Sequence, residues 1–126
     1  MKQSRTERRQ HPRTEGLLPL KISQKGLDVI TETKNISCSG VCCRVNKPIP
    51  LMTKLGLTLL LPIRHGTKVN TAKVKCKGVV VRSEPTIVEE ADTAYQSIAV
   101  FFSDLSKKDR GKITEYVLQS FRKDIF

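Results

Sequence analysis

Six short stretches of alternating apolar and polar residues, separated by turn signals, constrain the fold of this chain most. They occupy residues 18–22, 27–33, 41–45, 55–61, 69–82 and 95–102. A period of two residues places neighbouring side chains on opposite faces of a strand, so each stretch predicts a strand with one buried face. Between the first two stretches, Gln24-Lys25-Gly26 predicts a hairpin turn in which glycine can adopt a positive φ. Gly78 interrupts the fifth stretch and predicts a bulge or a sharp bend of the kind that barrel closure requires.

The periodicity changes after the sixth stretch. Ser106 and Asp109 match a helix-capping pattern. The apolar residues that follow recur at helical spacing, as Ile113, Val117 and Phe121. These residues predict a helix over 106–122 that lays one apolar stripe on the end or side of the strands. Six strands followed by one helix favour an all-β fold, a six-stranded antiparallel barrel with a C-terminal α-helix, over a βαβ fold.

Charge and periodicity divide the chain into three parts. Residues 1–16 are polar, highly charged and without a period, which predicts a flexible basic arm. Residues 17–103 hold the predicted barrel, and residues 104–126 hold the predicted helix packed on it. Between the last two strands, the segment from Glu84 to Thr93 carries four acidic residues and is expected to be a long solvated loop.

The chain is strongly basic, with 23 Lys and Arg against 12 Asp and Glu and a formal net charge of +11. A basic excess of this size favours polyanionic or nucleotide partners. The longest apolar stretch, Leu57 to Leu61, has the length of a strand, so no transmembrane segment is expected. The N-terminus is charged and lacks the apolar segment of a secretory signal, which predicts a cytoplasmic protein.

The four cysteines, Cys38, Cys42, Cys43 and Cys76, contain no Cys-x-x-Cys pair and lie far from both histidines in the sequence. Zinc sites are usually built from such spacings, so no metal and no cofactor are expected. Cys43 and Cys76 alternate with polar neighbours, which predicts small, reduced core residues.

Three arginines stand close together in the arm, in the segment Arg8-Arg9-Gln10-His11-Pro12-Arg13. Pro12 lacks a backbone donor and biases His11 toward extended geometry, which disfavours a helix. On a straight arm, the spacing points Arg9 and Arg13 the same way. A guanidinium group is a planar fork of donors that fits phosphate oxygens or the O6/N7 edge of guanine, and it can stack on a base. The segment therefore predicts a grip on a flat anion, with a solvated run of charge as the alternative.

A second polar segment, Asn35-Ile36-Ser37-Cys38-Ser39-Gly40, lies between two predicted strands. The amide of Asn35 and the hydroxyl of Ser37 are neutral donors and acceptors that can read the edge of a base. Gly40 permits a positive φ or the close approach of a ligand. The alternative is an ordinary turn.

Together, these two segments resemble the motifs of the PilZ domain family, which binds the bacterial second messenger cyclic di-GMP. The pattern of that family is RxxxR in an N-terminal arm and [D/N]xSxxG on a barrel. Here the motifs read Arg9-Gln10-His11-Pro12-Arg13 and Asn35-Ile36-Ser37-Cys38-Ser39-Gly40, in the expected order. The resemblance covers most of the chain and implies a PilZ-type barrel with a C-terminal helix.

The resemblance also implies a role for each motif residue. Arg9 and Arg13 would hold the phosphates and the Hoogsteen edge of guanine, and an arginine at the position of Arg8 tends to accompany a stacked pair of ligands. The barrel residues Asn35, Ser37 and Gly40 would hold the other side of the base.

The expected function is that of a cyclic di-GMP receptor whose arm closes over the ligand. It would signal to a separate downstream protein in motility, polymer secretion, pilus or regulatory machinery. An enzyme is not expected, because the sequence has no glycine-rich phosphate loop, no Gly-x-Ser-x-Gly and no evident carboxylate pair beside a histidine. The alternatives are a basic barrel that binds nucleic acid non-specifically and a protein adaptor that binds no nucleotide. The few aromatic residues, most at apparent core positions, argue against the first alternative, and the intact motifs argue against the second.

Overall fold

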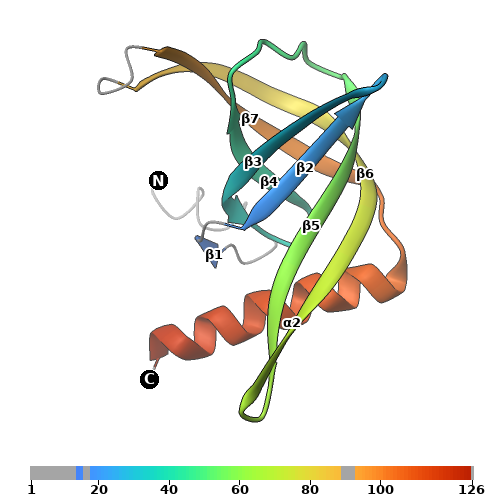
Figure 1. Ribbon diagram of the computed structural model, residues 1–126, viewed down its shortest axis with the longest axis vertical. Helices are drawn as coiled ribbons and strands as arrows, with labels where there is room; N and C mark the ends of the chain where they lie inside the picture. The colour runs from blue at the N-terminus through green and yellow to red at the C-terminus, as the bar shows by residue number, and fades with distance from the viewer. Residues whose placement is uncertain (1–13, 16–17, 89–92, 126) are drawn as a thin grey trace, which may run out of the picture.

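The computed structural model describes residues 14–15, 18–88 and 93–125 (Figure 1). Its strands are β1 (Thr14–Glu15), β2 (Pro19–Gln24), β3 (Leu27–Ile36), β4 (Gly40–Val45), β5 (Lys54–His65), β6 (Lys68–Val88) and β7 (Thr93–Asp104), and its helix is α2 (Lys107–Ile125). Strands β2 to β7 correspond to the six predicted stretches, and the predicted fold class is confirmed. The two-residue strand β1 was not predicted.

All strand pairs are antiparallel, and they form one sheet in the order β1-β3-β2-β5-β6-β7-β4. A further pairing of β3 with β4 closes the six long strands into a barrel. In this ring, β5 and β6 form the wall opposite β4 and β3 (Figure 1). Closure pairs strands that would otherwise present free edges.

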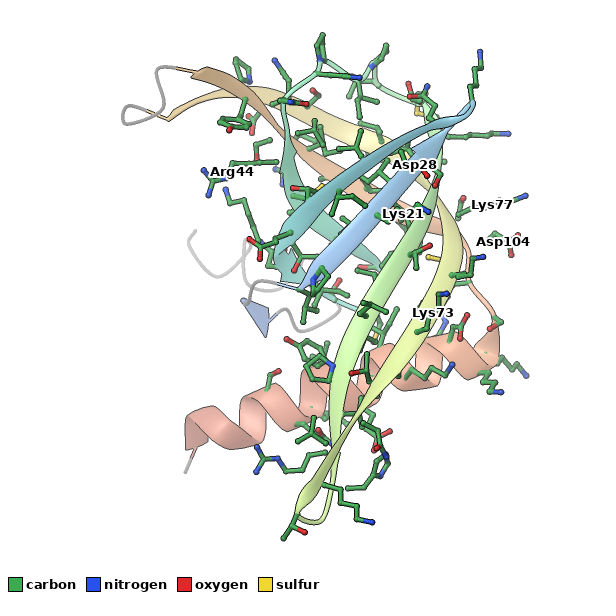
Figure 2. All side chains as sticks on the ribbon, in the orientation of Figure 1. Lys21, Asp28, Arg44, Lys73, Lys77 and Asp104 are labelled. Carbon is green, nitrogen blue, oxygen red and sulfur yellow. The ribbon has the colours of Figure 1, made fainter. Side chains whose placement is uncertain are left out.

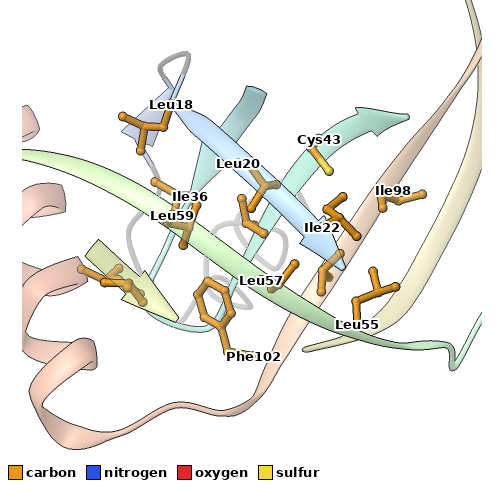
Figure 3. Close-up of a cluster of buried hydrophobic side chains, with 14 of the residues drawn as sticks. Leu18, Leu20, Ile22, Ile36, Cys43, Leu55, Leu57, Leu59, Ile98 and Phe102 are labelled. Atoms are coloured by element: carbon orange, nitrogen blue, oxygen red, sulfur yellow. The ribbon is translucent and has the colours of Figure 1, made fainter. Parts of the chain in front are cut away.

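The core fills the barrel with the inward side chains of every long strand (Figure 3). Alternation decides which these are: Leu55, Leu57, Leu59, Leu61 and Ile63 of β5 are all buried. Cys43 is also buried, as predicted, and burial raises the pKa of its thiol to about 12. Cys76 is only partly buried, and burial followed by the carboxylates of Asp109 and Asp104 raises its pKa to about 11. Both thiols are therefore protonated at neutral pH.

Two predicted backbone features are confirmed. Lys25 and Gly26 form the two-residue turn between β2 and β3 with φ of 47° and 83°, the conformation that matches the twist of a hairpin. The register of β6 and β7 shifts between Lys77 and Gly78. A Cβ atom at Gly78 would lie 2.5 Å from Val100 Cγ1, so only glycine lets the two strands approach at this bend.

The prediction of a long acidic loop from Glu84 to Thr93 was wrong for most of its length. β6 continues to Val88 and β7 begins at Thr93, and the two pair along this hairpin. The β-branched residues after Pro85 extend the ladder, whereas the prediction weighed only the acidic charges.

The helix begins where its capping pattern predicts. The backbone N–H of Asp109 donates to Ser106 Oγ at 3.1 Å, which places Ser106 at the N-cap. Ile113 and Val117 are buried against the barrel, while the side chain of Phe121 lies outside the described part. The helix runs to Ile125, beyond the predicted end.

Helix α2 crosses one end of the barrel beside the β5–β6 hairpin (Figure 1). There Gln119 Oε1 accepts from the N–H of Arg64 at 2.9 Å, and Gln119 Nε2 donates to the carbonyl oxygen of Arg64 at 2.8 Å. The amide of Gln119 thus bonds both backbone groups of Arg64, as a residue of a neighbouring strand would. No helix within residues 14–15, 18–88 and 93–125 is both long and apolar enough to cross a membrane.

Candidate binding site

Three of the six predicted site residues lie in the described part of the chain. Asn35 is the second-last residue of β3, Ser37 directly follows that strand, and Gly40 is the first residue of β4. The arginines of the arm, Arg8, Arg9 and Arg13, lie outside the described residues.

A β-bulge sets the direction of Asn35. Thr33 pairs with Cys43, but Asn35 pairs with Cys42, so Lys34 is an extra residue on β3. Strict alternation from the buried Thr33 would turn Asn35 inward and Ile36 outward. The extra residue reverses this: Ile36 is buried, and Asn35 shares the outer face with Cys42. Bulges commonly re-aim a side chain in this way next to binding sites.

The turn between β3 and β4 is built by Ser37 and Ser39. The N–H of Ser37 donates to the carbonyl oxygen of Gly40 at 2.9 Å, and the N–H of Ser39 donates to Ser37 Oγ at 3.2 Å. The two hydroxyls share a further hydrogen bond of 3.0 Å. Ser37 is 1% exposed, so its buried hydroxyl stabilises the turn from the inside of the barrel wall. The carbonyl oxygen of Ser39 accepts from the N–H of Phe102 at 2.9 Å, which ties the turn to β7.

A glycine is needed at position 40 because β7 approaches the backbone closely there. The φ of Gly40 is not positive, so of the two reasons predicted for a glycine here, a positive φ and the close approach of a ligand, the first does not apply. A Cβ atom here would collide with the carbonyl oxygen of Val100 and lie 3.3 Å from the Cα of Phe101. The glycine is therefore required by the barrel wall itself.

Strand β1 leads the chain directly to this turn. Thr14 pairs with Ile36, and Glu15 pairs with Asn35. β3 thus has β1 on one side and β4 on the other at the residues of the motif.

An aromatic ring next to the motif was missed by the sequence reasoning. Phe101 pairs with Gly40 across β4 and β7 and is 51% exposed, so it is an exception to the expectation that most aromatic residues lie in the core. The alternation of the strand could have revealed it, because Val100 and Phe102 are buried and the residue between them must point outward. On the same face, Cys42 pairs with Ala99. The surface beside Asn35 is therefore partly apolar.

Two exposed arginines border this face. Arg44 pairs with Ser97, and Arg82 pairs with Ala99. Neither forms an ion pair with any residue in the described part of the chain. The site therefore combines an amide, an aromatic ring and guanidinium groups, a set that suits a planar, anionic heteroaromatic ligand.

The same turn is bonded to helix α2. Cys38 Sγ lies 3.1 Å from Thr114 Oγ1, whose hydroxyl donates to the carbonyl oxygen of Arg110 at 2.9 Å, so the thiol is the donor of the first contact. In return, Arg110 Nη1 donates to the carbonyl oxygen of Cys38 at 3.1 Å. The motif turn and the N-terminal half of α2 are thus joined by a closed ring of hydrogen bonds.

A sequence model of the PilZ domain matches residues 7–119 of the chain. Among solved structures, the inhibitor of motility MotI/DgrA of Bacillus subtilis superposes with a TM-score of 0.72 at 19% identity, covering 94% of this chain and 52% of its own. The complex of K. pneumonia MrkH with c-di-GMP gives a TM-score of 0.71 at 16% identity, covering 94% and 53%. The chain therefore spans about half the length of these proteins.

A smaller protein matches over nearly its whole length. The PilZ domain of YcgR from Escherichia coli with c-di-GMP gives a TM-score of 0.64 at 10% identity, covering 93% of this chain and 94% of that one. At these identities the structural matches show a shared fold. No curated protein sequence matches the chain.

Proposed function

The chain belongs to the PilZ domain family, and we propose that it is a receptor for cyclic di-GMP. The observation that carries this proposal is the register of β1 and β3. Thr14 and Glu15, which follow the RxxxR segment in the sequence, pair with Ile36 and Asn35 of the NxSxxG motif, and this pairing supports a site to which both motifs contribute. Two proteins of the same fold, MrkH and the PilZ domain of YcgR, have structures with c-di-GMP.

In this proposal the motif residues have two kinds of role. Arg9 and Arg13 bind the phosphates and the Hoogsteen edge of guanine through their planar donor forks. Asn35 faces the ligand from the outer side of the barrel. Ser37 and Gly40 act through the turn, because the first is buried within it and the second is fixed by β7.

Phe101 extends the proposed site beyond the motif. Its half-exposed ring lies beside Gly40 and offers a face on which a guanine can stack. Stacking of a base on an aromatic side chain contributes about 1–3 kcal/mol. Arg8 is proposed to contact a second, stacked ligand.

The proposed signal is closure of the arm. The arm is mostly basic, and a dianionic ligand would give its arginines a common target, so ligand contacts would favour the closed state. A separate cytoplasmic partner would then read the closed arm and the covered barrel face. The ligand is bound and not transformed.

Salt dependence tests the receptor against a binder of nucleic acid. A protein that neutralises many phosphates on a polymer releases condensed counterions, so its affinity falls steeply with salt, whereas a dinucleotide has no such atmosphere. We expect a shallow salt slope for cyclic di-GMP and weaker binding by Asn35→Ala. Tighter, steeply salt-dependent binding of oligothymidylate, with Asn35→Ala indifferent, would instead support the nucleic-acid function.

A further inference from the structure

A row of exposed lysines runs along β6 on the wall opposite the motif. Lys73, Lys75 and Lys77, which we call the lysine row, occupy every second position, while Val74 between them is fully buried. Alternate residues of a strand share a face at a spacing of about 6.6–6.8 Å. Figure 2 shows Lys73 and Lys77 on the side of the barrel away from Arg44.

The lysine row borders a trough whose floor is β5. Gly56 pairs with Lys77 and Thr58 pairs with Lys75, while Ser23 of β2 lies on the other side of Gly56. Because Gly56 and Thr58 are small, the floor is low, and a hollow of about 430 Å³ opens there. Residues of β2 and β6 line its sides, and Asp104 and Ser106 also line it beyond β6. Adjacent strands are about 4.8 Å apart, so the two walls stand roughly 9.6 Å from each other.

No lysine of the row forms an ion pair within the described part of the chain, and the one carboxylate directly opposite the row is that of Asp104, which pairs with Lys77 across β6 and β7. The two ion pairs found in that part of the chain are Lys21–Asp28, at 3.2 Å, and Lys112–Asp109, at 3.3 Å. Neither includes a member of the row. Like charges at neighbouring positions on one face of a sheet repel each other, so carboxylates of a bound partner would reduce the repulsion among the three lysines.

We propose that this trough binds an extended acidic segment of a partner protein. A partner chain in β conformation repeats every two residues over the same distance as the lysine row, so carboxylates at alternate positions would meet Lys73, Lys75 and Lys77 in register. The hydroxyl of Thr58 lies at the floor, where it can bond the backbone of that segment, while the hydroxyl of Ser23 on the β2 wall bonds Asp28. Since the trough lies across the barrel from Asn35, the partner can bind while the proposed ligand site is occupied.

The trough favours a polypeptide over a nucleic acid for two reasons. Strands β2, β5 and β6 contain no Phe, Tyr or Trp, and the imidazole of His65 lies at the far end of β5, so the trough offers no stacking platform for bases. Across the sheet, Ser23, Gly56 and Lys77 are paired neighbours on β2, β5 and β6. Asp28 pairs with Ser23 at one end of this line, and Asp104 pairs with Lys77 at the other. These carboxylates repel a phosphate at every residue of a nucleic acid, whereas a polypeptide can carry its carboxylates only at alternate positions, opposite the lysine row.

A labelled peptide of alternating Glu and Thr, about twelve residues long, is the probe, and fluorescence anisotropy at low salt is the measurement. The variant Lys73→Thr/Lys75→Thr/Lys77→Thr removes the row and keeps residues that favour strands. Its affinity should fall about tenfold, since exposed charge pairs each contribute modestly. The control, Lys25→Asn/Lys47→Ala/Lys68→Ala, removes the same charge from exposed sites elsewhere and should bind as the wild type does. Asn suits the positive φ of Lys25.

A charge-reversed variant makes the test independent of any loss of affinity through misfolding. Lys73→Glu/Lys75→Glu/Lys77→Glu should reject the Glu–Thr peptide and bind a Lys–Thr peptide that the wild type rejects. Equal weakening by the row variant and its control would overturn the proposal and leave only net charge as the cause. So would oligothymidylate, or vesicles containing phosphatidylserine, depending on the row more strongly than the peptide does.

Discussion

Thr14 lies opposite Ile36 in the antiparallel pair of β1 and β3. Thr14 directly follows Arg13, and Ile36 directly precedes Ser37. The residue that follows the RxxxR segment is thus paired with the second residue of the NxSxxG motif, more than twenty positions away in the sequence. A ligand held by both would bridge the arm and the barrel, and its binding energy could then be transmitted as a change in the arm.

Limited trypsinolysis measures this change. Cleavage after Arg5, Arg8 or Arg9 requires an accessible, flexible chain, so saturating cyclic di-GMP should slow it if the arm closes. Cleavage after Lys107, an exposed residue at the start of α2, serves as the internal control and should not change. Equal rates at the arginines with and without ligand would place the switch elsewhere.

Two glycine substitutions should change stability in opposite directions. Gly40→Ala forces a methyl group against the carbonyl oxygen of Val100, and we expect it to lower the free energy of unfolding by about 1–3 kcal/mol. Gly111→Ala meets nothing within 4 Å in helix α2 and should raise it by about 0.5–1 kcal/mol. Urea denaturation compares the two. An undisturbed Gly40→Ala protein would contradict the close packing of β4 on β7.

Phe101→Ala should weaken binding of cyclic di-GMP with little effect on folding, because the ring is half exposed. Loss of one stacked base is expected to cost about 1–3 kcal/mol, roughly fivefold or more in the dissociation constant. Val69→Ala, at a similarly exposed residue on the β5–β6 hairpin, is the matched control. If both variants bind as the wild type does, the base does not stack on Phe101.

Stability should fall at alkaline pH in a manner that depends on Cys43. Burial raises the pKa of this thiol from its ordinary value of 9.0 to about 12, so between these pH values the folded protein keeps a proton that the unfolded chain releases. The unfolded state then binds fewer protons, and the free energy of unfolding decreases as pH rises, by up to about 4 kcal/mol. Cys43→Ala should flatten this alkaline limb relative to the wild type. An identical pH dependence in both proteins would show that Cys43 does not titrate this way.

The sequence predicted the barrel strands because alternation is a local signal. Leu55 to Leu61 shows a period of two that requires no knowledge of the fold, and the turn at Lys25-Gly26 is predicted by its own residues. The direction of Asn35 could not be predicted in this way. It depends on the extra residue Lys34, which is visible only once β3 is paired with β4.

The remaining parts of the site depend on tertiary contacts that no local pattern in the sequence shows. β1 is a strand of two residues, and it exists through its pairing with β3 rather than through any pattern of its own. The ring of hydrogen bonds through Cys38, Arg110 and Thr114 joins residues more than seventy positions apart. Phe101 is different, because the buried residues on either side of it already turned it outward.

Calorimetric titration with cyclic di-GMP is the most direct test of the proposed receptor. The wild-type protein should bind the ligand saturably, and Arg9→Ala and Arg13→Ala should each bind roughly tenfold to more than a hundredfold more weakly, since a charge-assisted hydrogen bond contributes about 1.5–3 kcal/mol. Arg13→Lys should also be impaired, because an ammonium group keeps the charge but loses the planar fork. A wild-type protein with no saturable binding, or arginine variants that bind as tightly as the wild type, would contradict the proposal.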